Sequence, residues 1–207
     1  MKILIILLLK SFLLANSYPY FTKKDFLDIR EKSGKIAENR AIDYQKTIKS
    51  YKKHSKKKQL LEVNFYLNQL LPQYDDITKK QEDYWSTPKE FLITGYGDCE
   101  DYVIIKYFSL LKLGFDKDKL FFTTVYEQYT GGYHMVLSYF QDKNKSPLIL
   151  DNLSFKILTL NKRKDLKADM FINSSGIYKI NKNNQLKKIQ NSSLKFDKLL
   201  QKIQRKN

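Results

Sequence analysis

The segment from Cys99 to Leu113 constrains the fold more than any other part of this chain. It reads as a helix that is apolar on most of its sides and that ends at Gly114. Such a helix has to be covered by other elements. The pattern then changes, and four strands are predicted at 120–126, 133–140, 148–153 and 155–160. We therefore expect an α+β fold in which this buried helix packs on an antiparallel sheet.

Further elements are predicted on both sides of this core. Periodicity and turn residues indicate a helix at 23–53, a helix at 60–71 stopped by Pro72, a polar connection at 73–88, a helical turn at 89–93, a hairpin within 170–190 and a surface helix at 193–205. There is no internal repeat and no obvious linker. A length of 207 residues suits one domain with a sizeable core. We expect that domain to span 18–207.

The charge balance is strongly basic, with 38 Lys and Arg against 22 Asp and Glu and a formal net charge of +16. Such an excess is compatible with a basic adaptor for nucleic acid or an anionic membrane. However, the basic residues are almost all lysines spread along the chain, and no arginine-rich recognition helix or zinc knuckle is found. The densest cluster, Lys52 to Lys58, is typical of a solvated helix face or loop. We therefore expect no nucleic-acid partner.

The N-terminal residues have the pattern of an export signal. Lys2 precedes the apolar run Ile3–Leu9, which is too short to span a bilayer, and Ala15-Asn16-Ser17 fits a cleavage site. We predict a signal peptide at 1–17. An uncleaved anchor or a buried N-terminal helix stays open as the alternative, because Lys10 interrupts the apolar run. Export would place the chain in an oxidising compartment, where its single cysteine, Cys99, cannot form an internal disulfide.

Cys99 is the first candidate for chemistry. It lies in Gly97-Asp98-Cys99-Glu100-Asp101, directly after a glycine loop and at the predicted start of the buried helix. A thiol at a helix N-terminus is expected to have a lowered pKa, because the positive end of the helix dipole favours the thiolate. A lone cysteine is often only a small buried residue. The charged neighbours and the helix-start position favour a nucleophile here.

His134 and Asp151 are the second and third candidates. His134 lies near the start of one predicted strand, and Asp151 interrupts the apolar strand Leu148–Leu153. A buried acid there is costly unless it is paired. A hairpin that turns at Asp142-Lys143 would place the two side chains opposite each other, although the turn could shift by a residue or two and exact opposition is not required. Asp151 could then accept a hydrogen bond from one ring nitrogen while the other faces the thiol.

A cysteine on a buried helix, packed against a sheet that carries His and then Asp, is the papain/transglutaminase arrangement of nucleophile, base and orienting acid. In that scheme Cys99 attacks a peptide carbonyl, His134 acts as acid and base, and Asp151 orients the ring. Trp85, the only tryptophan, could supply an oxyanion donor through its indole N–H or could simply pack in the core.

Four separated motifs together resemble the bacterial transglutaminase-like cysteine proteinases, and in particular their periplasmic adhesin-cleaving members. The motifs are Tyr84-Trp85-Ser86-Thr87-Pro88, Gly97-Asp98-Cys99-Glu100-Asp101-Tyr102, His134-Met135-Val136-Leu137 and Leu150-Asp151-Asn152-Leu153. The resemblance runs from about Val63 to about Lys182, and the order and intervals of Cys, His and Asp agree with it. The first thirty residues of the mature chain match no motif of the family.

The resemblance implies properties that spacing alone does not show. It implies a calcium-dependent periplasmic endopeptidase that cuts a large surface adhesin near its N-terminus and so releases cells from a biofilm. It also implies an inner-membrane receptor for cyclic di-GMP that holds the protease inactive. Carried over to this sequence, the calcium ligands would be Asp98 and Glu100, with Asp101 either a ligand or only a helix-capping acid. Carboxylate oxygens are the ligands that Ca²⁺ prefers.

Three other functions stay open at this stage. The same triad serves other acyl-transfer enzymes, such as a transglutaminase or a cell-wall amidase. A catalytically dead, calcium-dependent binding module would keep the fold without the reaction, although the intact Cys99, His134 and Asp151 argue against it. A basic adaptor would bind anionic partners in a salt-dependent way that is indifferent to Cys99.

Overall fold

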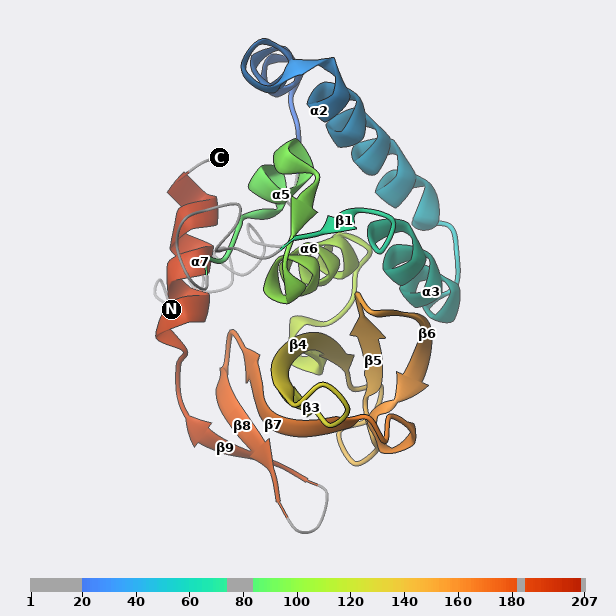
Figure 1. The fold of residues 1–207 in the computed structure, drawn as a ribbon, viewed down its shortest axis with the longest axis vertical. Helices are drawn as coiled ribbons and strands as arrows, with labels where there is room; N and C mark the ends of the chain where they lie inside the picture. The colour runs from blue at the N-terminus through green and yellow to red at the C-terminus, as the bar shows by residue number, and fades with distance from the viewer. Residues whose placement is uncertain (1–19, 74–83, 182–184, 206–207) are drawn as a thin grey trace, which may run out of the picture.

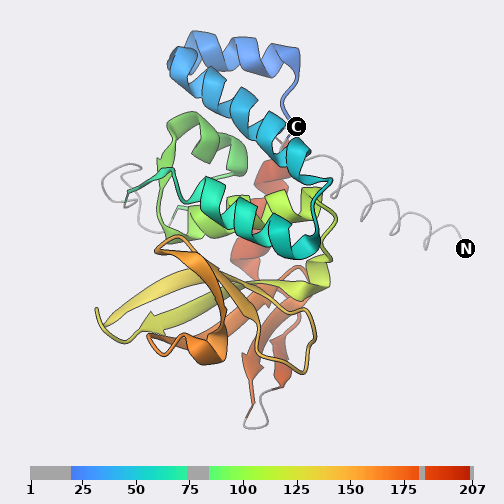
Figure 2. The ribbon, with the colours of Figure 1, turned by 90° about the vertical axis from the view of Figure 1, so that its right-hand side faces the viewer.

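The computed structural model describes residues 20–73, 84–181 and 185–205 of the chain. A layer of helices covers one face of an antiparallel sheet, as two perpendicular views show (Figures 1 and 2). The expected α+β fold, with the cysteine-bearing helix packed on the sheet, is therefore confirmed. The predicted signal peptide at 1–17 lies outside the described residues. Within them, no helix combines the length and the apolar character needed to cross a membrane.

The sheet has seven strands in the order β6-β5-β4-β3-β7-β8-β9, and every neighbouring pair is antiparallel. The strands are β3 (Leu120–Glu127), β4 (Gly132–Tyr139), β5 (Leu148–Asp151), β6 (Ser154–Thr159), β7 (Leu166–Asn173), β8 (Gly176–Ile180) and β9 (Leu186–Gln190). Single 3₁₀ turns precede β3 and follow β6, namely η1 (Lys117–Lys119) and η2 (Leu160–Lys162). The four strands predicted after Gly114 are β3 to β6, whereas the segment 170–190 lies in three strands rather than one hairpin.

The helices are α2 (Lys23–Tyr51), α3 (Lys56–Leu67), α5 (Pro88–Thr94), α6 (Cys99–Lys112) and α7 (Leu194–Arg205). A short parallel pair, β1 (Leu71–Pro72) and β2 (Tyr96–Gly97), joins the end of the α3 segment to the loop before α6. Helix α6 lies at the centre of the molecule, where it contacts α3 and α5 as well as β3, β4 and β5 (Figure 1). Its residues from Glu100 to Leu110 are all buried. The all-round apolar character of this segment thus results from contacts on every side.

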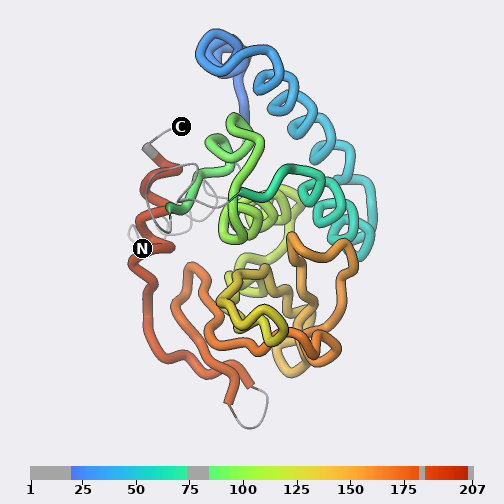
Figure 3. Tube along the Cα trace, in the orientation of Figure 1, coloured from blue at the N-terminus to red at the C-terminus, as the bar shows by residue number. Residues whose placement is uncertain are grey.

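The aromatic residue Phe122 of β3 connects α6 to the C-terminal helix. Its ring lies 5.2 Å from the ring of Tyr107 on α6 and 5.1 Å from that of Phe196 on α7. In the Cα trace, α7 lies beside α5 and α6 although strands β3 to β9 separate them in sequence (Figure 3). Phe196, Leu199 and Ile203 are all buried. The predicted surface helix therefore contributes one full apolar face to the core.

Two of the predicted helices differ in detail from those observed. The segment 23–53 contains a kink, because Gly34 adopts φ 85°, a left-handed conformation that breaks helical geometry. The helix predicted at Leu60–Leu71 begins earlier and ends earlier, at Lys56 and Leu67. The reason for the early start is Ser55, whose hydroxyl accepts a hydrogen bond from the N–H of Lys58 and so caps the first turn.

The loop that leads into α6 is built by local caps. Thr87 and Glu90 form a capping box at the start of α5, with Pro88 at its first position. The helix ends at Gly95, which has φ 80° and against which the guanidinium of Arg40 packs so closely that a Cβ there would lie 2.2 Å from Cζ. Arg40 also donates to the carbonyls of Leu92 and Ile93, at 2.8 and 3.0 Å. These contacts fix where the chain turns towards Cys99.

Gly97 provides a test of how tightly this loop is packed. A Cβ at Gly97 would lie 2.5 Å from Oδ2 of Asp101 and 2.8 Å from the ring of Phe91. Both neighbours are fully buried, so neither can move away freely. We predict that Gly97→Ala lowers the free energy of unfolding by about 1–3 kcal/mol, measured by urea denaturation. The matched control is Gly132→Ala, where the nearest atom is 3.8 Å away and little change is expected. Equal midpoints for Gly97→Ala and the parent protein would contradict the prediction.

Candidate active site

Cys99 is the first residue of α6, and Asp98 before it has extended backbone angles as the N-cap. The thiol donates a hydrogen bond to Oε2 of Glu100 at 3.1 Å. On the other side, the backbone N–H of Met135 in β4 faces the sulfur. Met135 directly follows His134, so the thiol lies beside the strand that carries the predicted base. The fold therefore brings the start of α6 to β4, as the sequence predicted.

The pKa of the Cys99 thiol differs from the sequence-based expectation. Burial is the largest influence and raises the pKa, and the negative charge and hydrogen bond of Glu100 raise it further. The N–H of Met135 acts in the opposite direction but is outweighed. The prediction that the helix N-terminus would lower this pKa is therefore wrong for this structure. The physical reason is that desolvation and an adjacent carboxylate outweigh a helix dipole.

His134 and Asp151 are joined by a hydrogen bond of 2.9 Å between Nε2 and Oδ1. Since a carboxylate only accepts, Nε2 carries the proton and Nδ1 is left as the potential base. The register of the hairpin is shifted by two residues from exact opposition of His134 and Asp151, which is within the shift that the prediction allowed. Strand β4 pairs with β5 through Leu137–Leu150 and Tyr139–Leu148, which continues to place Val136 across from Asp151. Because side chains alternate with a period of two, His134 and Asp151 still share one face of the sheet.

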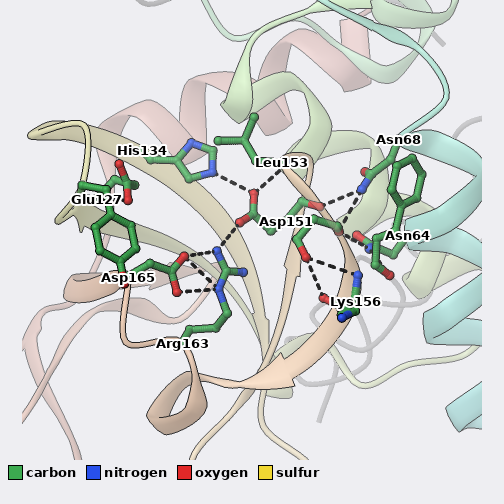
Figure 4. A network of polar contacts seen from close by, with 12 residues as sticks. Asn64, Asn68, Glu127, His134, Asp151, Leu153, Lys156, Arg163 and Asp165 are labelled. Atoms are coloured by element: carbon green, nitrogen blue, oxygen red, sulfur yellow. Dashed lines mark hydrogen bonds and ion pairs between the residues drawn. The ribbon is translucent and has the colours of Figure 1, made fainter.

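The carboxylate of Asp151 accepts three hydrogen bonds and is only 1% exposed (Figure 4). Besides His134, the N–H of Leu153 donates to Oδ1 at 2.9 Å, and Nη2 of Arg163 donates to Oδ2 at 2.8 Å. Burial by itself would raise the pKa of Asp151, but these donors hold it well below its usual range. Asp151 is therefore ionised at neutral pH, as an orienting acid must be.

Cys99 and His134 line the same cavity, which has a volume of about 380 Å³. Its other walls come from α6, β3, β4 and β7, through Glu100, Thr124, Tyr133, Met135, Asp169 and Met170. The thiol and the ring are not hydrogen-bonded to each other here, since the thiol donates to Glu100 instead.

Trp85 does not line this cavity. Its ring packs 5.5 Å from that of Phe122, and Nζ of Lys195 lies 4.7 Å above it. The indole N–H is buried and has no acceptor within the part of the chain that the structure describes. Of its two predicted roles, the structure favours core packing over oxyanion stabilisation.

The three predicted calcium ligands occupy different environments. Asp98 is the N-cap of α6, Glu100 accepts from the Cys99 thiol, and Asp101 is fully buried and accepts from the N–H of Ser86 at 2.7 Å. Across the described ranges, no three His, Cys, Asp or Glu side chains are grouped closely enough to hold a metal ion. Asp101 thus fixes the Trp85-Ser86 segment, and the trio is not gathered into a formed site.

Arg163 is a residue of this region that the sequence did not reveal. It follows η2 and contacts both Asp151 and Asp165 (Figure 4). A signal was present, because only four of the 38 basic residues are arginines. Arg30 and Arg40 also have specific partners in the structure. In a chain that uses lysine for surface charge, an arginine marks a place where the planar guanidinium is needed.

A buried polar network fixes the β5–β6 turn that follows Asp151. Nζ of Lys106 on α6 donates to Oδ1 of Asn64 at 2.8 Å, and Nδ2 of Asn64 donates to the carbonyl of Ser154 at 2.9 Å. Asn68 donates to the backbone carbonyl of Asp151 at 2.8 Å. Burial lowers the pKa of Lys106 to about 7, with the charge of Asp151 acting against this shift. Helices α3 and α6 therefore hold the main chain that carries Asp151.

The low pKa of Lys106 predicts a specific pH dependence of stability. Between about pH 7 and its ordinary value of 10.5, the unfolded chain binds a proton that the folded chain does not. The free energy of unfolding should therefore rise as pH increases from 7, by up to about 1.4 kcal/mol per pH unit. Lys106→Met should remove this slope, although it leaves Asn64 without its donor. Urea denaturation of both proteins between about pH 7 and 9 measures it, and parallel curves would contradict the assignment.

The comparisons with known proteins agree with this geometry. A family model of the bacterial transglutaminase-like cysteine proteinases matches residues 33–167. The calcium-bound structure of LapG from Legionella pneumophila is 33% identical, with a TM-score of 0.74, and the match covers 88% of this chain and 99% of that one. The EGTA-treated LapG structure is 34% identical, with a TM-score of 0.76, covering 89% and 99%. A comparison with curated protein sequences gives no match.

Proposed function

Because this chain belongs to the bacterial transglutaminase-like cysteine proteinases and is a LapG-type protease, we propose that Cys99, His134 and Asp151 are its catalytic triad. The observation that carries the proposal is the 2.9 Å hydrogen bond from His134 to the buried Asp151, at the wall of the cavity that Cys99 lines. His134 and Asp151 have the contact that their roles require, and the thiol of Cys99 would have to turn from Glu100 to His134.

The proposed reaction proceeds through a thioester. The thiol proton passes to Nδ1 of His134 while the sulfur attacks the carbonyl carbon of the scissile bond. The backbone N–H of Cys99 stabilises the oxyanion, and the amine leaves with the proton from His134. Water then gives its proton to His134 and attacks the thioester, which releases the acid and restores the thiol. Throughout, Asp151 keeps the proton on Nε2 and the ring in place.

We also propose that the protease depends on calcium. The chemistry of the donor set fits, because Asp98, Glu100 and Asp101 offer only carboxylate oxygens at one end of α6. Asp98 and Glu100 would be the principal ligands, since Asp101 already accepts from Ser86. A bound Ca²⁺ would order the loop before α6 and thereby the direction of the Cys99 side chain. The calcium-bound and EGTA-treated structures of LapG support this part of the proposal.

The substrate and partners are proposed from the family resemblance. We propose that the mature protein acts in the periplasm on the N-terminal region of a large surface adhesin and so controls release from a biofilm. An inner-membrane receptor for cyclic di-GMP would sequester it. The similarity to LapG, which covers 88% of this chain and 99% of that chain, supports these assignments.

The test uses purified protein and N-terminal fragments of large surface proteins encoded in the same genome. We expect one discrete cut in one fragment, lost in EGTA and regained on adding CaCl₂. Cleavage that survives excess EGTA would contradict the calcium dependence alone, and the absence of cleavage in every fragment would contradict the substrate. A primary amine added to the reaction separates the alternatives, because a transglutaminase would incorporate it into the product.

A further inference from the structure

We infer that Arg163 is a positioning residue of the triad. Its guanidinium is anchored on Asp165 and holds the carboxylate of Asp151 in the plane in which that carboxylate accepts from His134. The inference rests on the proposed function of that triad. It assigns to Arg163 a role that acts through Asp151 and not on the substrate.

The contacts of Asp151 show what the guanidinium adds. Oδ1 accepts both His134 Nε2 and the N–H of Leu153, whereas Oδ2 accepts from Arg163. The χ2 torsion that carries the carboxylate has broad, two-fold minima. Two donors on one oxygen therefore leave the carboxylate free to rotate about this bond. A third donor on the other oxygen removes that freedom. Arg163 thus determines the direction from which His134 is held.

The guanidinium is itself fixed on its other side. Nε donates to the two carboxylate oxygens of Asp165 at 2.9 and 3.0 Å, and Nη2 donates to Oδ2 of Asp165 at 2.6 Å. The side chain is only 11% exposed. The backbone on both sides is tied down, because the N–H of Arg163 donates to the carbonyl of Leu160 and Gln128 donates to the carbonyl of Asp165. The planar fork is therefore a rigid bridge from the β6–β7 connection to Asp151 (Figure 4).

The geometry requires arginine and not merely a positive charge. One nitrogen, Nη2, uses its two hydrogens on two different carboxylates, while Nε binds Asp165 in the same plane. A lysine ammonium at this position would keep the charge between Asp151 and Asp165 but would lose the coplanar pair of bonds. Charge compensation and orientation can therefore be separated by substitution.

The test compares Arg163→Met, Arg163→Lys and Asp165→Asn in the full chain. The first readout is the tautomer of His134 in ¹⁵N-labelled protein, recorded by NMR at a pH well above the ordinary histidine pKa. The chain has two histidines, and His54 is an internal reference because it binds Glu62 through Nδ1 rather than Nε2. The second readout is kcat and KM for the adhesin fragment. Arg30→Met, which removes a guanidinium paired with Glu38 on α2, is the control.

We expect a single Nε2–H tautomer of His134 in the parent protein and in Arg30→Met. Both Arg163 variants should show a mixture of tautomers and a kcat lowered about 10- to 100-fold, with KM within about twofold. Asp165→Asn keeps the ion pair with Asp151, so it should fold and shift both readouts in the same direction by less. If the Arg163 variants do not fold, Asp165→Asn alone tests the positioning role of Arg163.

Two results would overturn the inference. One is an unchanged tautomer and kcat in Arg163→Met, or in Asp165→Asn if the Arg163 variants do not fold. The other is full recovery of both readouts in Arg163→Lys, which would reduce the role to charge compensation. The NMR readout needs no cleavage, so a parent protein that cuts no fragment would count against the proposed function and leave the positioning role to be decided by the tautomer.

Discussion

Replacing Cys99 by alanine is expected to lower peptide cleavage by at least about 10⁴-fold while the fold stays intact. The reason for the loss is that Cys99 is the only thiol in the chain, so no other side chain can form the thioester. The reason for the intact fold is that the side chain is small and only partly buried, and that the hydrogen bond it donates goes to the adjacent Glu100 of the same helix. Cleavage of the adhesin fragment in the presence of calcium measures the first effect, and the urea midpoint measures the second.

The matched controls for this variant use the two histidines. His134→Gln should lose cleavage nearly as completely as Cys99→Ala, because both belong to one catalytic unit. His54→Gln, which removes one of the partners of Glu62 on α3, should cleave at the parent rate. A Cys99→Ala protein that still cuts the fragment would refute the cysteine mechanism for this chain.

Replacing Asp151 by asparagine should lower kcat by about 10³- to 10⁴-fold and also destabilise the fold. The asparagine amide can present its NH₂ group to the ring, which favours the tautomer with the proton on Nδ1 and removes the base facing the thiol. In addition, Arg163 would lose one of its two carboxylate partners while keeping Asp165, which should lower the free energy of unfolding by about 1–3 kcal/mol. Kinetics on the fragment and urea denaturation measure the two effects separately.

The control for this variant comes from the same hairpin. Asp142 lies in the β4–β5 turn, where its side chain is 45% exposed and only 3.9 Å from Nζ of Lys145. Asp142→Asn removes the same charge from the same hairpin without touching the triad, so neither kcat nor stability should change appreciably. If Asp151→Asn behaved like Asp142→Asn, Asp151 would not be the orienting acid.

Local patterns predicted the elements that carry the site. The helix predicted from Cys99 to Leu113 agrees with α6 to within one residue at its end. An apolar run between a glycine loop and Gly114 can form few other structures. The hairpin of β4 and β5 was also predicted, since two largely apolar segments flank a polar stretch in which a turn can form. The exact pairing was not, because the turn across Asp142 and Lys145 sets the register and several polar residues could have formed it.

The charge environment of the site could not be predicted from local sequence patterns. The pKa of Cys99 depends on how deeply α6 is covered and on the direction of the Glu100 side chain, and neither can be read from neighbouring residues. Arg163 follows Asp151 by twelve residues, and only the course of β6 and η2 returns it to that carboxylate. Lys106 looked like one more lysine of a basic chain, although it is fully buried.

The sequence by itself determined the type of fold and indicated the residues that we propose as nucleophile, base and acid, because periodicity, helix caps and residue chemistry are local properties. Only the tertiary structure decided the exact register of β4 against β5 and the raised pKa of the Cys99 thiol. It also decided the separate environments of Asp98, Glu100 and Asp101, and the bridge from Arg163 to Asp151. These features depend on which distant segments exclude water from a group and which donors reach it. Burial and pairing across the fold, rather than residue type, set the electrostatics of the site.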